Sequence, residues 1–267
     1  MLGHIKNKLK LLAGLLALSF LISLAPSNAQ ENPNNLENQT FLVALNKGHY
    51  DQAISLGKAE GTSDGLAIAA RATLIKAQFF TSDKLERLGL ISDALSLAKL
   101  ATDLTPTHIG GLLQQSIAIG FRGRLLTAGT DARASKDLLQ QVLLLEPENP
   151  WGLAGVGAWH GEIVIHAGKI FGKVFYGAKT KQMRGFFLEA LINDPKNIAI
   201  RAGFTQTLLR LGGSVDREFA THQLIILKSQ TPANHLEKIL YDQSMILLPL
   251  AKANKKKALK AYLKTIR

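Results

Sequence analysis

Three side chains that could bind a metal or transfer a proton lie close together near the middle of the chain: His160, Glu162 and His166. Metal ligands on one helix need a spacing of three or four residues to share a face. His160 and His166 are six residues apart and fall on different faces, whereas Glu162 and His166 are four apart and could act together. Two ligands do not make a site, so we predict no metal and no cofactor. An ordinary helix face is the favoured interpretation, and a general acid or base role for His160 is the alternative.

A serine and a lysine, Ser55 and Lys58, have the spacing of the nucleophile motif in penicillin-binding enzymes. That chemistry also needs Ser-Asp-Asn and Lys-Thr-Gly elements, and the sequence contains neither. The match is therefore attributed to chance. We predict no catalytic residues and a protein that is not an enzyme.

Glycines crowd the same central region, at positions 152, 155, 157, 161, 168 and 172. None of them precedes a Lys-Ser or Lys-Thr pair, so they do not form a phosphate-binding loop. A glycine inside a helix costs up to about 1 kcal/mol relative to alanine, so some other interaction should compensate. Close contact between helices is the natural reason, and a groove floor kept open for a ligand is the alternative.

Positive charge is concentrated in two stretches. The insertion from Gly168 to Gly185 contains basic and aromatic residues and no acid, and the last twenty residues, Leu248–Arg267, contain seven basic residues and no acid. The basic surface residues predicted from them are Lys169, Lys173, Lys256 and Lys260. Both stretches are interpreted as solvated helical faces, the second as a capping helix of a repeat protein. Contact with an anionic membrane surface or an acidic partner is the alternative.

The elements that carry these residues repeat. Three segments align without gaps around Pro106, Pro147 and Pro195, and each has an apolar helix end, a proline, a polar residue two positions later and a new apolar helix. A weaker fourth stop lies at Pro232. Proline cannot continue a helix but fits the first turn of the next one. The pattern indicates stacked helical hairpins, none of which buries its apolar face alone.

The second helix of such a hairpin, with Ala94, Ala98, Ala101 and Pro106, resembles that of a tetratricopeptide repeat. Gly48–Ala53 resembles the turn between the two helices of that repeat. The resemblance implies an all-α fold, a right-handed α-solenoid of helical hairpins with a C-terminal capping helix. The proline spacings exceed the family period of 34 residues, so each unit is stretched by insertion.

The resemblance also implies that the first helices of the hairpins line a concave groove. Counting from the prolines, the predicted lining residues are Leu113, Ile117, Trp151, Ala154, Ala158, Gly161, Ala202 and Gln206. This groove is apolar, has small residues on its floor and lacks an array of Lys, Arg and Asn that would clamp a peptide carboxylate. An apolar helix of a partner, an acyl chain or the protein's own C-terminal helix would suit it.

The first residues have the order of an export signal: a basic start (Lys6, Lys8 and Lys10), the apolar run Leu11–Ala25, and small residues before a cut after Ala29. The apolar run is shorter than the roughly 20 residues of a spanning helix, which favours cleavage over an uncleaved inner-membrane anchor. We predict a signal peptide at 1–29, a linker at 30–40, a tetratricopeptide-like domain at 41–232 and basic capping helices at 233–267.

Composition agrees with an exported globular protein. Of 267 residues, 46% are hydrophobic and 19% charged, and there is no cysteine, which excludes a disordered chain and a disulfide scaffold. The net charge of +12 lies largely in the tail, which disfavours nucleic acid as a partner. We predict a periplasmic, non-catalytic scaffold for an unidentified protein partner. The alternative is a periplasmic carrier of a small apolar ligand or lipid, which would need a closed pocket.

Overall fold

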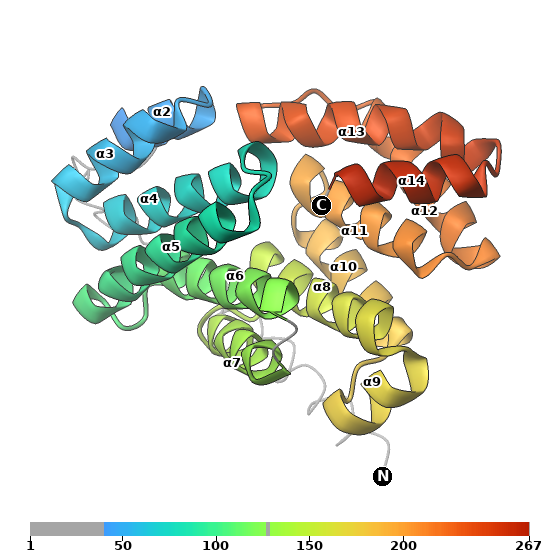
Figure 1. Cartoon of the computed structure of the whole chain (residues 1–267), viewed down its shortest axis with the longest axis horizontal. Coiled ribbons are helices and arrows are strands. Elements are labelled where there is room, and N and C mark those ends of the chain that lie inside the picture. The colour runs from blue at the N-terminus through green and yellow to red at the C-terminus, as the bar shows by residue number, and fades with distance from the viewer. Residues whose placement is uncertain (1–39, 127–128, 267) are drawn as a thin grey trace, which may run out of the picture. The chain divides into compact units, whose positions relative to one another are not determined.

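The computed structural model describes residues 40–126 and 129–266, all within one compact unit, Glu37–Arg267. Every regular element among these residues is a helix (Figure 1). The α-helices are α2 (Thr40–Asn46), α3 (Tyr50–Glu60), α4 (Ser63–Ile75), α5 (Lys84–Leu104), α6 (Ile109–Leu126), α7 (Gly129–Leu145), α8 (Pro150–Ala167), α9 (Lys169–Tyr176), α10 (Thr180–Asn193), α11 (Ile198–Leu211), α12 (Ser214–Lys228), α13 (His235–Lys252) and α14 (Lys256–Thr265). A π-helical turn, η2 (Lys76–Phe80), follows α4 directly. The predicted signal peptide and linker lie outside the described residues, apart from Thr40.

The helices pack as antiparallel hairpins in chain order: α2–α3, α4–α5, α6–α7, α8–α10, α11–α12 and α13–α14. The first helices of successive hairpins also contact one another, from α2 to α4, α6, α8, α11 and α13. Figure 1 shows this succession running from α2–α3 to α13–α14. The predicted all-α solenoid of hairpins is therefore confirmed. We call α4, α6, α8, α11 and α13 the inner helices.

The repeated proline motif works through the polar residue two positions after each proline. The side chains of Asn149 and Asn197 accept hydrogen bonds from the first backbone N–H groups of α8 and α11. Nδ1 of His108 accepts from Gly111 N at 3.0 Å at the start of α6, and Asn234 accepts from Glu237 N at 3.0 Å at the start of α13. Each motif thus ends one helix and caps the next, since the first N–H groups of a helix have no partner within it.

The glycines of α8 lie at contacts between helices. A Cβ on Gly155 would be 2.4 Å from Leu139 of α7, one on Gly157 would be 2.9 Å from Phe187 of α10, and one on Gly161 would be 2.3 Å from Thr207 of α11. These distances are too short for a carbon atom, so α8 approaches three neighbours more closely than alanine would allow. Close helix contact therefore accounts for the glycine-rich stretch.

The observed helices differ from those that the sequence predicts most clearly at α7 and at the junction of α13 and α14. The apolar pattern predicts a helix from Lys136, but α7 begins at Gly129, where Asp131 supplies a carboxylate in the first turn. Pro249 is expected to end a helix near Leu248, but α13 continues to Lys252. α14 follows and buries Leu259 and Leu263 in the core that α11 and α13 share. Its role as a cap stays a prediction, as do the domain boundaries at 41 and 233.

Candidate functional site on the inner helices

Arg71 of α4 is half-buried and lies near aromatic residues of α3 and α8. Its guanidinium carbon is 5.7 Å from the ring centroid of Trp151 on α8, a cation–π geometry. Among the described residues it forms no hydrogen bond and no ion pair within 4.0 Å. Burial lowers the pKa of Arg71, and the charge of Glu237 on α13 partly offsets this effect. A cation with five N–H donors therefore lies on the inner helices without a hydrogen-bonding partner.

An aromatic cluster borders this arginine where the first hairpin meets the last. The Tyr50 hydroxyl and Nδ1 of His235 form a hydrogen bond of 2.9 Å. The ring of Phe80 lies 5.5 Å from that of Tyr50 and stacks at 6.4 Å on that of His235. Burial raises the pKa of Tyr50, while the charge of Arg71 opposes the rise. The tyrosine is thus a neutral donor or acceptor beside the half-buried cation.

A second arginine network centres on Glu162 of α8. Its carboxylate accepts hydrogen bonds from Arg210 of α11, and Nε2 of His166 lies 3.3 Å from Oε2. Burial raises the pKa of Glu162, but the hydrogen bonds from His166 and Arg210 and the charges of Arg210 and Arg124 lower it to about 2. A carboxylate this well paired is a poor proton acceptor at neutral pH, so its evident role is to hold α8 against α11.

His160 is separated from this network, as its six-residue spacing from His166 predicts. The residue is 3% exposed, and its ring centroid lies 5.0 Å from that of Trp159 and stacks at 6.0 Å on that of Phe186. Nδ1 accepts a weak hydrogen bond of 3.4 Å from the backbone N–H of Lys179. Burial, together with the charges of Lys136 and Lys179, lowers the pKa of His160 to about 4. It is therefore a neutral core residue at physiological pH, and within 40–126 and 129–266 no three potential ligands approach a metal geometry.

The eight predicted groove residues fall into two groups. Trp151 is 38% exposed, and Ile117, Ala158 and Gln206 are half-buried; the amide nitrogen of Gln206 lies 3.4 Å from Oε1 of Gln243 on α13. The buried members are Leu113, Ala154, Gly161 and Ala202. The exposed and half-buried residues could therefore contact a partner directly, whereas the buried ones could not. The groove as a whole stays a prediction.

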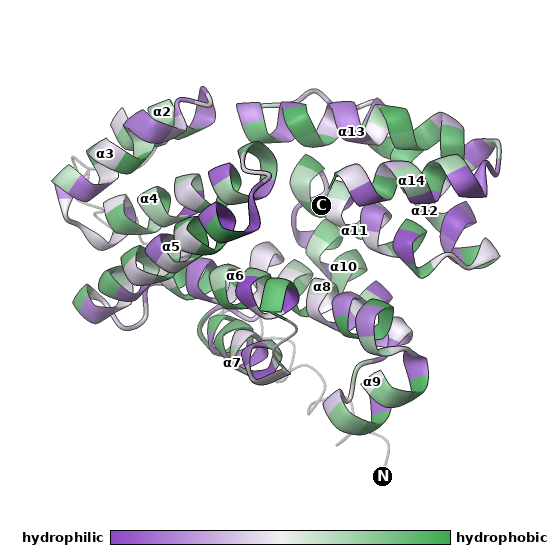
Figure 2. Ribbon diagram, in the orientation of Figure 1, coloured by the Kyte–Doolittle hydropathy of each residue, from purple (hydrophilic) through white to green (hydrophobic). Residues whose placement is uncertain are grey.

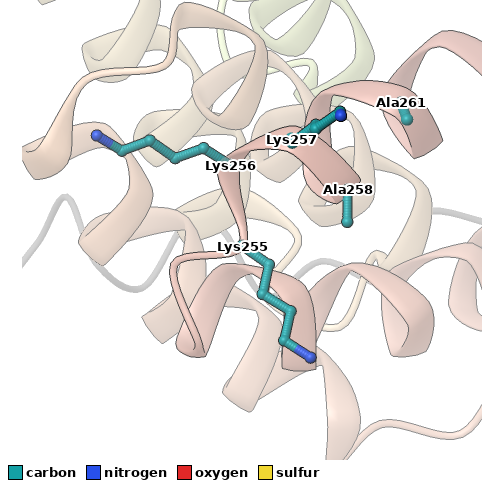
Figure 3. Close-up of a pocket in the computed structure, with 5 residues that line it drawn as sticks. All are labelled: Lys255, Lys256, Lys257, Ala258 and Ala261. Carbon is teal, nitrogen blue, oxygen red and sulfur yellow. The ribbon is translucent and has the colours of Figure 1, made fainter.

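All four predicted basic surface residues, Lys169, Lys173, Lys256 and Lys260, are exposed. A depression of about 580 Å³ lies beside Lys255, Lys256 and Lys257 at the start of α14. Figure 3 shows these three side chains pointing away from one another, so they do not converge on a single anion. A second depression, of about 480 Å³, lies along α9. Both are open to solvent, whereas the carrier hypothesis expects a closed pocket.

Counting from the prolines did not identify the inner arginines. Arg71, Arg124 and Arg210 belong to inner helices, and Arg124 Nη2 donates to Gln78 Oε1 at 3.1 Å. The expectation of a groove without basic residues is thus incomplete, because it omitted α4 and placed no weight on the ends of α6 and α11. One signal was present: Arg71 is the lone charged residue in the segment from Leu66 to Ile75.

Comparison with known proteins supports the fold. No protein-family model matches the sequence, and no curated protein is significantly similar to it. Among solved structures, a thermophilic tetratricopeptide-repeat protein of Thermus thermophilus superimposes with a TM-score of 0.54 at 18% identity. The match covers 77% of this chain and 94% of that one. The chain thus has the fold of a tetratricopeptide-type helical solenoid.

Proposed function

We propose that this protein is a non-catalytic, exported scaffold that binds an acidic segment of a protein partner on its inner helices. The tetratricopeptide-type fold supports an interaction role, since proteins of this architecture commonly bind other proteins. Fold by itself does not fix function, so the proposal depends on a site.

The observation that carries the proposal is the Arg71–Trp151 pair. The Arg71 residue is half-buried and no protein group within the described residues hydrogen-bonds to its guanidinium, whose N–H donors are left to solvent. A carboxylate of a partner would replace this solvent with charge-assisted hydrogen bonds, and Trp151, which is 38% exposed, would pack against the apolar part of the same segment. Aromatic and arginine side chains of this kind are the residue types that dominate binding energy at protein interfaces.

Export is the second part of the proposal, and it rests on the sequence of residues 1–29. The order of basic, apolar and small residues there supports cleavage after Ala29. Cell fractionation with N-terminal sequencing of the natural protein tests it. A mature N-terminus at Gln30 in the periplasmic fraction is the expected result. An intact N-terminus in the membrane fraction would instead indicate that the uncleaved segment anchors the protein.

Partner binding is tested by site-specific photo-crosslinking in the native host. A crosslinker at Trp151 is expected to capture a protein partner, whereas one at Leu144, which is 82% exposed on α7, is not. The partner identified from Trp151 is then purified and titrated against the wild type and Arg71→Met. Because hydrogen bonds to charged groups contribute about 1.5–3 kcal/mol, we expect the variant to bind about 10- to 150-fold more weakly.

Arg217→Met on α12 serves as the charge-matched control, since Arg217 is outside the inner helices and is expected to leave affinity unchanged. Equal crosslinking from Trp151 and Leu144, or equal affinity of the wild type and Arg71→Met, would contradict binding at this site.

A further inference from the structure

α9 exposes a continuous apolar face. The exposed fractions are 83% for Ile170, 50% for Phe171, 69% for Val174 and 57% for Phe175. These four positions follow the spacing of one side of a helix, and the two phenylalanine rings contact each other with centroids 4.2 Å apart. Among the described helices, none other leaves four large apolar side chains exposed within two turns. An exposed cluster of this kind marks a surface with a partner.

The opposite side of α9 is fixed to the protein. Gly172 is buried, and a Cβ there would lie 3.2 Å from Ile163 of α8. Tyr176 packs against a buried cluster that includes Trp159 and Val164 of α8, and the guanidinium carbon of Arg133 on α7 lies 5.5 Å from its ring centroid. The helix is bounded by two glycines with positive φ, Gly168 and Gly177. The apolar face therefore points outward because the other side is held by α7 and α8.

The charges beside this face all have one sign. Lys169 and Lys173 are exposed on α9 itself, and Lys179 and Lys181 follow at the start of α10, also exposed. No acidic residue occurs between Gly168 and Gly185. Figure 2 shows the resulting alternation of hydrophobic and hydrophilic residues on α9. Arg184 is not part of this set, because it is paired with Asp216.

We propose that α9 is a docking element for an anionic phospholipid surface, with its apolar face among the acyl chains and its lysines at the headgroups. Short amphipathic helices with Phe and Leu-type side chains on one face and lysine on the other bind in this way. Protein interfaces are also enriched in phenylalanine, but lysine is depleted from them while arginine is enriched. The charged residues of this insertion that remain unpaired are all lysines, which favours lipid over a protein.

The test is flotation of the chain from Gln30, which contains the whole compact unit, with two kinds of vesicle. We expect binding to vesicles of phosphatidylcholine with phosphatidylglycerol, and weak or no binding to phosphatidylcholine alone, at about 0.1 M salt. Lys169→Gln with Lys173→Gln should weaken binding about fivefold per lysine, or about 30-fold together. Phe171→Gln with Phe175→Gln should weaken it by about tenfold or more, since the apolar contact is lost.

Matched controls change exposed residues elsewhere. Leu144→Gln with Ile192→Gln removes two side chains that are 82% and 76% exposed on α7 and α10, and Lys58→Gln with Lys99→Gln removes two exposed lysines on α3 and α5. Both pairs should bind vesicles as the wild type does. All variants should keep the wild-type melting temperature, since the changed side chains are exposed.

Absence of binding to the anionic vesicles would overturn the proposal, and so would equal binding by the phenylalanine variant. Sedimentation equilibrium tests self-association, the remaining explanation for the exposed face. A dimer that the phenylalanine variant disrupts, without vesicle binding by the wild type, would assign the face to self-association instead. These results are independent of the inner-helix proposal, because neither Arg71 nor Trp151 is changed.

Discussion

The hydroxyl of Tyr50 and Nδ1 of His235 form a hydrogen bond of 2.9 Å between residues 185 positions apart in the chain. It joins the first residue of α3 to the first residue of α13. Gly48 makes room for the contact, because a Cβ there would lie 2.5 Å from the His235 ring. Its φ of +82° is a second reason for glycine at this position. Hairpins in a solenoid normally contact their chain neighbours alone. Here the first and last hairpins touch, which places Arg71 and Glu237 near one another.

Tyr50→Phe should lower the free energy of unfolding by about 1 kcal/mol, because the His235 ring loses its hydrogen-bond partner. The variant keeps the aromatic packing on Phe80, so the effect should be local. Hydrogen exchange should increase in α2, α3 and the first turns of α13 and stay unchanged in α8. Denaturant unfolding and exchange measured by mass spectrometry check both effects.

Tyr241→Phe is the control for this experiment, since its hydroxyl donates to Lys228 O at 3.2 Å between neighbouring helices. It should leave exchange in α2 and α3 at the wild-type rate. Unchanged exchange in α2 and α3 of Tyr50→Phe would mean that the contact does not hold the two ends together.

Asn197→Ala should destabilise the protein by about 1 kcal/mol through loss of the cap of α11. Asn197 is buried, its Oδ1 accepts from Ile200 N at 2.9 Å and its Nδ2 donates to Asp194 at 2.8 Å. Thermal unfolding checks the change, with exposed Gln182→Ala on α10 as a control that should be nearly neutral. Equal stability of both variants would show that the proline motif acts through the proline and not through the cap.

The hairpins could be predicted from the sequence because their signals are local. A proline, a capping side chain and apolar residues at helical spacing all act within a few positions of Pro106, Pro147 and Pro195. As this motif predicts, α5, α7 and α10 each end two residues before their proline. The six-residue spacing likewise predicts that His160 and His166 lie on different faces of one helix, because it depends on helical geometry alone. Insertions between the repeats do not disturb these local rules.

The contacts of Arg71 could not be predicted in the same way. They depend on how the hairpins stack in three dimensions. Arg71 and Trp151 are 80 positions apart in the chain, and no local pattern predicts their contact. The exposed face of α9 was similarly hidden, since its residue pattern fits equally a helix that packs its apolar side inward. Gly172 and Tyr176 decide the orientation, and their role depends on contacts with α7 and α8.

His160 should make the protein sensitive to mild acid. Its folded pKa is about 4, below the ordinary value of 6.5, so the unfolded chain binds the proton more tightly. The associated stability is fully present above about pH 6.5 and is lost as the pH falls toward about 4, by about 3 kcal/mol at most. His160→Gln should flatten this part of the stability profile, measured by denaturant unfolding across that range.

Exposed His222→Gln on α12 is the matched control and should retain the wild-type slope. A slope that persists in His160→Gln would assign the acid sensitivity to another group and remove the basis for treating this histidine as a buried neutral residue.

Gly161→Ala should destabilise the protein by about 1–3 kcal/mol, because the new Cβ would lie 2.3 Å from Cγ2 of Thr207. Thr207 is 5% exposed and its hydroxyl donates to Gly203 O at 2.8 Å, so it has little freedom to move away. Gly203→Ala in α11 is the control: nothing lies within 4 Å of its Cβ position, and the alanine should stabilise the helix by about 0.5–1 kcal/mol. Thermal unfolding distinguishes the expected loss of stability in Gly161→Ala from the expected gain in Gly203→Ala. Wild-type stability of Gly161→Ala would mean that α8 and α11 do not need a glycine to pack, and a groove floor would again be the better explanation for this residue.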